Sequence, residues 1–315
     1  MESGDILIIM QLSKIGIGTW GIGGFMEPDP NNNDQKQIDA LVYSLNKGVN
    51  YVETVYMYAK GKAVDLLSEA YKKSGAKRDD VFVTLSVYQR DAKISEEVEA
   101  RVNEFLKTFG TDHVDSVQFT MGLVRDLGLD QIKSLVDKLI TSGKTKFTSL
   151  TNSSLEFLKI YHETFGNKLF AHEGVFNFEV RENEKYGLTQ YAKENNILNV
   201  VFQSLRRNMT AARNWPLLIE LSKKYGKAQN QIILNWIVSK GFFPIVKSST
   251  KNHIDENLAA FDFQIENEDL KRLNEFEIPG YTSPEIDWYD TGKGEKIHNL
   301  PNVWDALYEK QLNNK

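Results

Sequence analysis

The feature that most constrains the fold is an alternation of short apolar runs with longer amphipathic segments along almost the whole chain. The apolar runs have strand character and occupy residues 14–20, 49–53, 81–87, 114–120, 146–151, 168–174, 198–204 and 242–248. Segments with helical spacing lie between them, and those at 38–48, 64–75, 98–110, 132–143 and 186–196 end in Gly or Asn, as a helix C-cap does. Repeated strand and helix pairs predict a parallel sheet covered by helices.

No Gly-, Ser- or Pro-rich linker interrupts this alternation, and a strand-to-strand unit of about 30 residues suits a βα crossover. We therefore predict one α/β domain over residues 1–315, with a closed (β/α)8 TIM barrel at about 11–277. Two helical segments, 253–261 and 267–276, follow the eighth strand. The tail 278–315 contains turn formers and aromatic residues, and we expect it to lie over the barrel mouth or beside the barrel.

The composition excludes several classes of function. A net charge of −5 and a pI near 5.7 argue against a nucleic-acid surface. The absence of Cys excludes disulfides, thiolate nucleophiles and cysteine-ligated metals, and the five scattered His offer no metal-ligand spacing, so no metal site is expected. The N-terminal apolar run is too short for a signal peptide or a membrane span. We expect a soluble cytoplasmic protein that acts on a small molecule; nothing in the composition indicates its oligomeric state.

The stretch YVETVYMY, from Tyr51 to Tyr58, marks the candidate site. It begins as a buried strand and then places an acid, Glu53, and a phenol, Tyr58, where the strand gives way to a helix. Side chains at the carboxyl ends of barrel strands face the ligand. An acid and a phenol at that position are candidates for proton transfer.

Several motifs, taken in order, resemble those of the aldo-keto reductases. They are GIGTWGIGG near the start, ETVYMY at the second strand, TN after the fifth strand and IVKSSTKNHIDENLAAFDF near the end, and the resemblance covers roughly residues 11–277. It implies a (β/α)8 barrel that binds NADPH or NADH without a Rossmann domain. It also implies an oxidoreductase that reduces aldehydes or ketones by hydride transfer and protonation.

The resemblance places the family's catalytic aspartate, tyrosine, lysine and histidine on Glu53, Tyr58, Ser86 and Thr120, so that only the tyrosine is unchanged. Ser86 cannot supply the positive charge that lowers the pKa of a phenol. Thr120 can hydrogen-bond a substrate oxygen but cannot titrate near neutrality. Because Glu53 lacks its cationic partner, we expect its pKa to be raised. A structural glutamate in a decayed site is the alternative interpretation.

The resemblance also implies a site for the adenosine end of the cofactor. It assigns the 2′-phosphate to Lys247, Ser248 and Thr250, where a cation and hydroxyls suit a dianion, and the adenine to Glu256 and Asn257. His253 stands where an arginine is usual, so the segment favours NADP(H) but leaves NAD(H) open. A surface turn before a helix would explain the same residues.

Around the nicotinamide, the resemblance assigns the carboxamide contacts to Thr151 and Asn152. Glu173 replaces a glutamine, and Gln203 replaces a stacking aromatic residue, so both weaken the expectation of nicotinamide binding. Of the neighbours His172 and Glu173, only one can face the interior, and we expect it to be Glu173.

Three further assignments follow from the resemblance. Ser204 and Arg206, beside Arg207, lie where the family's loop meets the pyrophosphate. Gly18 and Thr19 are implied as cofactor contacts. Trp20 is implied as a wall of the substrate pocket.

Two classes of function remain open. The first is an NADP(H)-dependent oxidoreductase for a small carbonyl compound, in which Tyr58 donates the proton, Glu53 is its partner and Thr120 contacts the oxyanion. The second is a barrel without hydride transfer. It would be either a cofactor-binding protein without catalysis or a lyase or isomerase that uses Glu53, Tyr58 and Glu173 for proton transfer.

Overall fold

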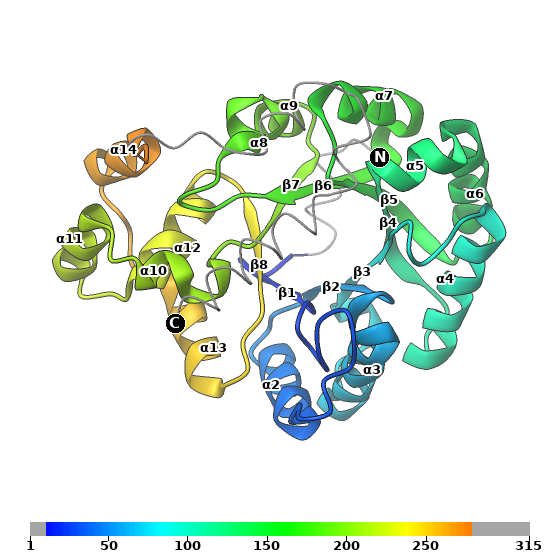
Figure 1. Ribbon diagram of the computed structural model, residues 1–315, viewed down its shortest axis with the longest axis horizontal. Helices are drawn as coiled ribbons and strands as arrows, with labels where there is room; N and C mark the ends of the chain where they lie inside the picture. The colour runs from blue at the N-terminus through cyan, green and yellow to red at the C-terminus, as the bar shows by residue number, and fades with distance from the viewer. Residues whose placement is uncertain (1–10, 279–315) are drawn as a thin grey trace.

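Eight parallel strands close into a barrel in chain order in the computed structural model, which describes residues 11–278 (Figure 1). The strands are β1 (Gly16–Gly18), β2 (Tyr51–Val55), β3 (Phe82–Val87), β4 (Val114–Thr120), β5 (Thr145–Thr151), β6 (Leu169–Val175), β7 (Leu198–Phe202) and β8 (Phe243–Val246). β1 pairs with both β2 and β8, which closes the sheet. The predicted (β/α)8 barrel is confirmed.

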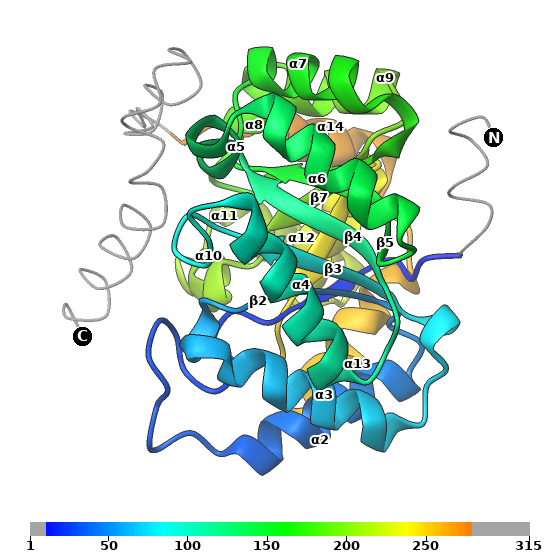
Figure 2. The same cartoon turned by 90° about the vertical axis from the view of Figure 1, so that its right-hand side faces the viewer.

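Helices surround the barrel on the outside (Figures 1 and 2). They are α2 (Asp34–Asn46), α3 (Lys62–Ser74), α4 (Ser95–Phe109), α5 (Met121–Leu127), α6 (Leu129–Thr141), α7 (Leu155–Phe165), α8 (Glu182–Lys185), α9 (Leu188–Glu194), α10 (Met209–Ala212), α11 (Pro216–Tyr225), α12 (Gln229–Ser239), α13 (Lys251–Leu258) and α14 (Asn267–Glu275). Short 3₁₀ turns are η1 (Tyr58–Gly61), η2 (Arg78–Asp80), η3 (Gly166–Lys168), η4 (Arg206–Asn208) and η5 (Ala259–Phe261). Within residues 11–278, every helix is too short or too polar to span a bilayer.

The second strand starts later than the sequence suggests. β2 runs from Tyr51 to Val55, whereas the apolar pattern indicates 49–53. The reason is Asn50, whose side-chain oxygen accepts a 2.7 Å hydrogen bond from the backbone N–H of Ser13 and so holds a loop closed before the strand. Glu53 therefore lies in the middle of β2, opposite Gly18 of β1.

The amino-terminal end of the barrel is filled by aromatic and aliphatic side chains. The rings of Phe82 and Phe170 stack at 4.3 Å, and Tyr51 stacks on Phe82 at 5.5 Å. Gly16 leaves room for this layer, because a Cβ at that position would meet Tyr51 at 2.6 Å and Phe243 at 2.9 Å. Polar side chains follow toward the carboxyl ends of the strands, so the site lies at that end.

Backbone strain is concentrated at the carboxyl end of the barrel. Non-glycine residues with positive φ follow β2, β5 and β7 at Ala59, Lys60, Asn152, Gln203, Arg206, Arg207, Asn208 and Asn214; Asn196, before β7, is the exception among the described residues. Such conformations are costly and tend to gather at functional sites. The strain supports the assignment of this rim as the working face of the barrel.

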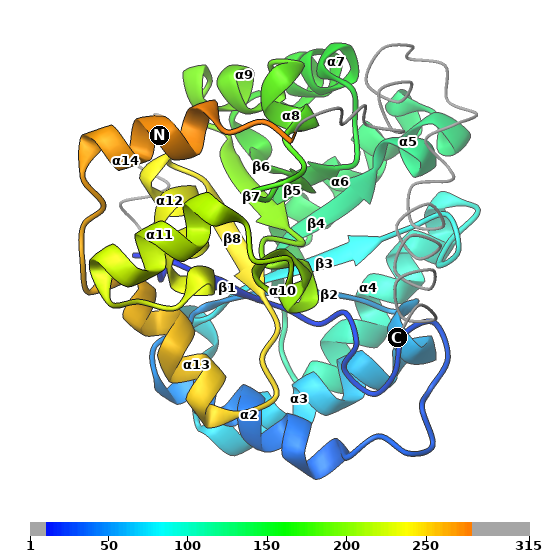
Figure 3. The same cartoon turned by 60° about the vertical axis from the view of Figure 1, so that its left-hand side comes forward.

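The chain beyond β8 packs on the barrel exterior. The guanidinium of Arg181 donates to the backbone carbonyls of Leu273 and Asn274 at 2.7 and 2.8 Å. The indole N–H of Trp236, on α12, donates to Oδ1 of Asn274 at 2.8 Å, and Figure 3 shows α14 beside α12. Apart from Ile278, the tail predicted at 278–315 lies outside the described residues.

Candidate active site

Glu53 and Ser86 form a buried pair on neighbouring strands. The side chains belong to β2 and β3, and Glu53 is only 2% exposed. The hydroxyl of Ser86 donates to Oε1 of Glu53 at 2.9 Å. Where the resemblance implies a lysine, Ser86 therefore supplies a neutral hydrogen-bond donor to the carboxyl of Glu53.

Gln118 extends this pair across the barrel. Its side-chain amide, from β4, donates to Oγ of Ser86 at 2.8 Å and to Oε2 of Glu173 at 3.1 Å. Glu173 belongs to β6, which lies on the far side of the barrel from β2. Glu173 thus faces the interior as predicted, and four side chains from four strands form one hydrogen-bonded network.

The network holds two acids without a cation. Burial raises the pKa of Glu53 to about 7, and the hydrogen bond from Ser86 opposes this only in part. Burial, followed by the charge of Glu53, raises the pKa of Glu173 well above its usual value. Among the described residues, neither carboxyl takes part in a salt bridge within 4.0 Å. The raised pKa predicted for Glu53 therefore agrees with its surroundings, because a buried charge without a partner is costly.

Tyr58 lies in the turn after β2, as the first residue of η1, and is buried. Trp20 packs edge-on against its ring at 4.8 Å, and Phe25 lies 5.4 Å from Trp20. Burial, followed by the charge of Glu53, raises the pKa of Tyr58 well above 10. The phenol is therefore protonated at neutral pH, so that it has a proton to donate.

Thr120 has a structural role, and its predicted contact with a substrate oxygen stays a prediction. Its hydroxyl caps α5 by accepting a 3.1 Å hydrogen bond from the backbone N–H of Leu123. The same hydroxyl donates to Oε1 of Gln89 at 2.9 Å. A substrate oxygen would have to replace Gln89 as the acceptor.

Thr151, Asn152 and Gln203 lie at the carboxyl ends of β5 and β7. The backbone N–H of Asn152 donates to the carbonyl of Glu173 at 3.1 Å, so Asn152 and Glu173 lie side by side at the ends of the fifth and sixth strands. Oε1 of Gln203 is buried and has no hydrogen-bond partner among the described residues. The hydroxyl of Ser204 is used within its own loop, where it donates to the carbonyl of Val201 at 3.1 Å.

Arg206 is placed differently from the expectation of a pyrophosphate contact. Its guanidinium forms an ion pair with Glu179, and the side chains of both residues are buried. Arg213 adds a second contact to Glu179 at 3.1 Å, and Nε1 of Trp215 donates to it at 2.6 Å. Arg206 therefore helps to hold the loop after β7, and its role toward a cofactor stays a prediction.

Lys247, Arg207 and Lys36 bring three positive charges together. Partial desolvation, followed by the charges of Arg207 and Lys36, lowers the pKa of Lys247. The ammonium of Lys247 donates to Oγ of Ser249 at 2.7 Å. These three residues, from the segment after β8, the loop after β7 and α2, thus form a positive region suited to a phosphate dianion.

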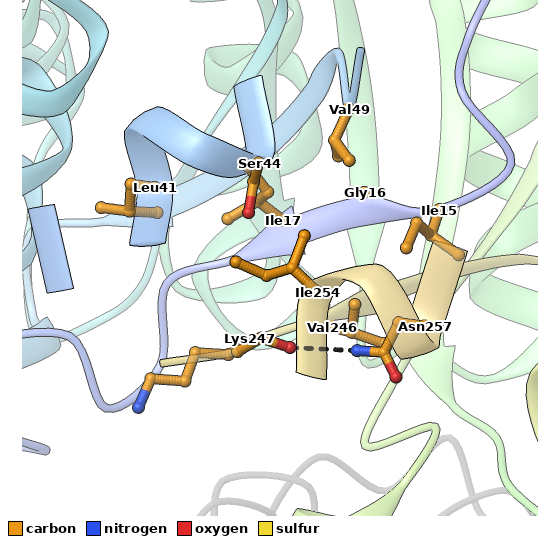
Figure 4. A pocket seen from close by; sticks show the side chains of 11 residues that line it. Ile15, Gly16, Ile17, Leu41, Ser44, Val49, Val246, Lys247, Ile254 and Asn257 are labelled. Carbon is orange, nitrogen blue, oxygen red and sulfur yellow. Dashed lines mark hydrogen bonds between the residues drawn. The ribbon is translucent and has the colours of Figure 1, made fainter. Parts of the chain in front are cut away.

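A small pocket adjoins this positive region (Figure 4). Leu41 and Ser44 of α2 line it on one side of β1, and Ile254 of α13 lines it on the other. Lys247, Ser248 and Asn257, which the resemblance assigns to the adenosine end, also line it, and Asn257 donates to Oγ of Ser248 at 3.0 Å.

The remaining residues of this predicted segment lie on α13 or cap its start. Thr250 caps the helix by accepting from the backbone N–H of His253 at 3.3 Å, and the carbonyl of Glu256 accepts from Gln231 at 2.9 Å. Gly18 ends β1, the strand that pairs with β8, and the hydroxyl of Thr19 donates to that of Thr54 at 2.9 Å.

The Aldo/keto reductase family model matches residues 14–278. The chain belongs to this family. The NADPH-dependent alpha-keto amide reductase of Saccharomyces cerevisiae is 25% identical over 76% of this chain and 78% of that protein. Among solved structures, a thermostable aldo-keto reductase in complex with the inhibitor epalrestat has a TM-score of 0.76 and 25% identity, and the match covers 84% of this chain and 94% of that one. A second aldo-keto reductase, complexed with NADPH, has a TM-score of 0.70 and 22% identity over 87% of each chain, and supports the fold.

Two residues of the candidate site and its neighbouring loop, Gln118 and Glu179, were missed by sequence reasoning. Gln118 stands two residues before Thr120 on one strand, so the alternation of side chains could have placed it on the interior face. Glu179 carries no such signal, because it lies in the irregular segment between β6 and α8. Within residues 11–278, no group of three or more His, Cys, Asp or Glu side chains could hold a metal.

Proposed function

We propose that the protein is an NADP(H)-dependent oxidoreductase that reduces a small aldehyde or ketone, with Tyr58 as proton donor and Glu53 as its acidic partner. The observation that carries this proposal is the buried tyrosine in the turn after β2, near the carboxyl of Glu53, whose pKa burial raises to about 7. A group that exchanges protons is most effective when its pKa lies near the working pH, and the carboxyl of Glu53 meets that condition, whereas the phenol of Tyr58, with its raised pKa, does not.

The described residues fit a nicotinamide cofactor. Lys247, Arg207 and Lys36 supply positive charge for a 2′-phosphate. The charges of Arg207 and Lys36 lower the pKa of Lys247, which supports the proximity of the three residues. Gln203 offers a buried acceptor without a protein partner, which suits a ligand amide. The cofactor supplies the hydride when bound.

The remaining chemistry belongs to the side chains of the barrel mouth. The protonated phenol of Tyr58 donates to the carbonyl oxygen of the substrate as negative charge develops there. Glu53 lies where its charge, when the carboxyl is ionised, raises the pKa of Tyr58. Trp20 packs edge-on against the ring of Tyr58 and excludes water from that side.

Titration of the full-length chain with NADPH, followed by fluorescence, tests the cofactor, and a panel of small aldehydes and ketones tests the reaction. Tyr58→Phe should keep cofactor binding and lose most of the turnover, about 10²-fold or more. Glu194→Gln, at an exposed position on α9, is the matched surface control. Binding with no turnover of any carbonyl would refute the reductase while leaving a cofactor-binding protein.

A second candidate function follows from the two buried acids. Glu53 and Glu173 are joined through Ser86 and Gln118 without a cation, which is an arrangement suited to proton transfer without hydride. It predicts that a lyase or isomerase substrate is converted in the absence of NADPH. The double variant Ser86→Lys with Thr120→His separates the two candidates, because reductase activity found only in that variant would exclude the reductase as the natural function.

A further inference from the structure

Resting on the proposed function, we propose that Phe25 is a positioning residue for the proton donor Tyr58, and that Arg207 holds Phe25 in place. Phe25 lies in the loop of residues 19–33, which joins β1 to α2, and Arg207 lies in η4, after β7. The resemblance to the family assigns no role to Phe25. Its role follows from a row of contacts that runs from Arg207 through Phe25 to the turn that carries Tyr58.

The turn that carries Tyr58 has a strained backbone. Tyr58 is the first residue of η1, and the next two residues, Ala59 and Lys60, have φ angles of 47° and 53°. Both angles lie in the left-handed region, which non-glycine residues adopt at a cost and chiefly where the surrounding structure holds them there. The direction of the Tyr58 side chain therefore depends on the contacts that hold this turn.

The loop of residues 19–33 contacts all three residues of the turn at 58–60. The contacts are the ring of Trp20 on Tyr58, the backbone carbonyl of Phe25 on Ala59 and the carboxylate of Glu27 on Lys60. The backbone N–H of Ala59, which is fully buried, donates to the carbonyl of Phe25 at 2.5 Å. The ion pair is 2.6 Å long but contributes little, because its side chains are 68% and 65% exposed. The hydrogen bond to Phe25 is therefore the contact that fixes the backbone of the turn.

Two further side chains hold the ring of Phe25. Its centroid lies 5.4 Å from that of Trp20, and the guanidinium of Arg207 lies 4.5 Å from it. A guanidinium over an aromatic ring is attracted by the negative face of the π system. Phe25 is 50% exposed, so burial alone does not fix its ring, and these two contacts decide where the ring lies. Holding the ring also holds the backbone carbonyl of Phe25, which receives the N–H of Ala59.

The base of the loop is anchored separately from Phe25. The anchor is the buried side chain of Gln37, on α2. Its Oε1 accepts from the backbone N–H of Gly23 at 2.7 Å and from the amide of Asn32 at 3.0 Å, and its own amide donates to the carbonyl of Gly21 at 3.1 Å. Loss of the Phe25 ring should therefore leave the loop folded and act on the turn at 58–60 alone.

The position of the phenol matters because proton transfer depends steeply on geometry. The hydroxyl of Tyr58 must lie within hydrogen-bond distance of the substrate oxygen as charge develops there, and a small displacement of a reacting group slows the reaction strongly. Without the ring of Phe25, the carbonyl that receives Ala59 is held less firmly, and the strained turn relaxes more freely. The chemical step becomes slower, whereas the charge of Arg207 remains for the cofactor phosphate.

The first test compares two substitutions of Phe25 in the full-length chain, with a carbonyl compound that the wild type reduces. Phe25→Leu should lower kcat about tenfold at saturating NADPH and leave the dissociation constant of NADPH within about twofold of the wild type. Phe25→Tyr keeps the ring and should retain most of the turnover. Ile160→Ala, on α7, is the matched control, because Ile160 is also an exposed apolar residue, 41% exposed.

A double variant tests the part played by Arg207. Arg207→Lys keeps the charge but replaces the planar guanidinium, so it should also lower kcat at saturating NADPH. If Arg207 acts through Phe25, the double variant Phe25→Leu with Arg207→Lys should lose no more turnover than Phe25→Leu alone. Losses that multiply would show that Arg207 acts by another route, and would overturn this part of the inference.

Carbon NMR of the full-length chain, labelled at the ζ carbon of tyrosine, reads the surroundings of Tyr58 without turnover. Loss of one signal in Tyr58→Phe assigns it to Tyr58. Phe25→Leu should shift or broaden this signal, because the phenol then samples other directions, whereas Ile160→Ala should leave it unchanged.

The outcomes separate this inference from the proposed function. An unchanged kcat in Phe25→Leu, a loss confined to the affinity for NADPH, or a lower kcat with an unchanged Tyr58 signal overturns the positioning role. If Phe25→Leu does not fold, Arg207→Lys alters the same contact from its other side and decides by the same readouts. A wild-type chain that reduces no carbonyl compound overturns the proposed function, and the NMR signal then still decides whether Phe25 holds Tyr58.

Discussion

The hydroxyl of Ser86 donates a 2.9 Å hydrogen bond to Oε1 of Glu53, from the position at which the aldo-keto reductase pattern implies a lysine. An ammonium there would hold the carboxyl ionised, whereas a hydroxyl leaves burial to dominate its pKa. This difference turns a charged pair into a neutral network, and a lysine at position 86 should restore the charge.

Replacing Ser86→Lys should lower the pKa of Glu53 and make the phenol of Tyr58 more acidic, because a cation favours both anions. We expect reductase turnover to rise at least about tenfold, within the range of general acid catalysis. Carbon NMR of labelled glutamate reads the pKa of Glu53 directly. Ser86→Met is the control, since it adds length without charge; an equal gain in both variants would speak against the electrostatic explanation.

The raised pKa of Glu53 predicts how stability depends on pH. A carboxyl that binds its proton more tightly in the folded state makes the free energy of unfolding fall as the pH rises from about 4.5 to about 7, by about 1.4 kcal/mol for each unit of pKa shift. His172, whose pKa is lowered to about 4 by burial, acts in the opposite direction. Glu53→Gln isolates the carboxyl: urea unfolding of wild type and variant should converge at low pH and diverge toward pH 7, with the variant more stable. Parallel curves would show that Glu53 does not titrate in this window.

Glu179 should be the strongest polar contributor to the loop after β7. Its carboxyl receives Arg206, Arg213 and the indole N–H of Trp215, and Glu179→Gln would leave Arg206 buried without a full counter-charge. Loss of one partner of a buried pair costs roughly 3 kcal/mol or more.

Denaturant unfolding measures that loss for Glu179→Gln, and hydrogen exchange of residues 203–215 shows whether the loop loosens. Arg213→Met is the milder comparison, because the Arg213 side chain is 37% exposed. An effect on stability no larger than that of Arg213→Met would mean that the buried pair contributes little.

Gly16 should tolerate no side chain. A Cβ there would meet Tyr51 at 2.6 Å, Phe243 at 2.9 Å and Ile245 at 3.0 Å, so Gly16→Ala should lower the free energy of unfolding by about 1–3 kcal/mol through overpacking. Gly18→Ala, two residues along the same strand, meets only Ile245, at 3.3 Å, and should cost less. Thermal unfolding of both variants checks the order, which a comparable loss at Gly18 would contradict.

The alternation of strands and helices could be predicted from the sequence. Each element buries one face, so apolar residues recur along it at a regular spacing. β4 has the predicted bounds, and the C-caps of α3 and α4 fall on the predicted Gly75 and Gly110. The bounds of β2 were wrong by two residues, since the side chain of Asn50 closes a loop that periodicity does not reveal.

By itself, the sequence determined the barrel and the positions of Glu53, Tyr58, Ser86 and Thr120, because local patterns and the order of motifs are properties of the chain. Only the tertiary structure decided their partners. It linked Glu53 to Glu173 by hydrogen bonds that run through Gln118, and it paired the guanidinium of Arg206 with the carboxylate of Glu179. These contacts link residues far apart in the chain, and their strength depends on distance and burial, which exist only once the barrel has closed.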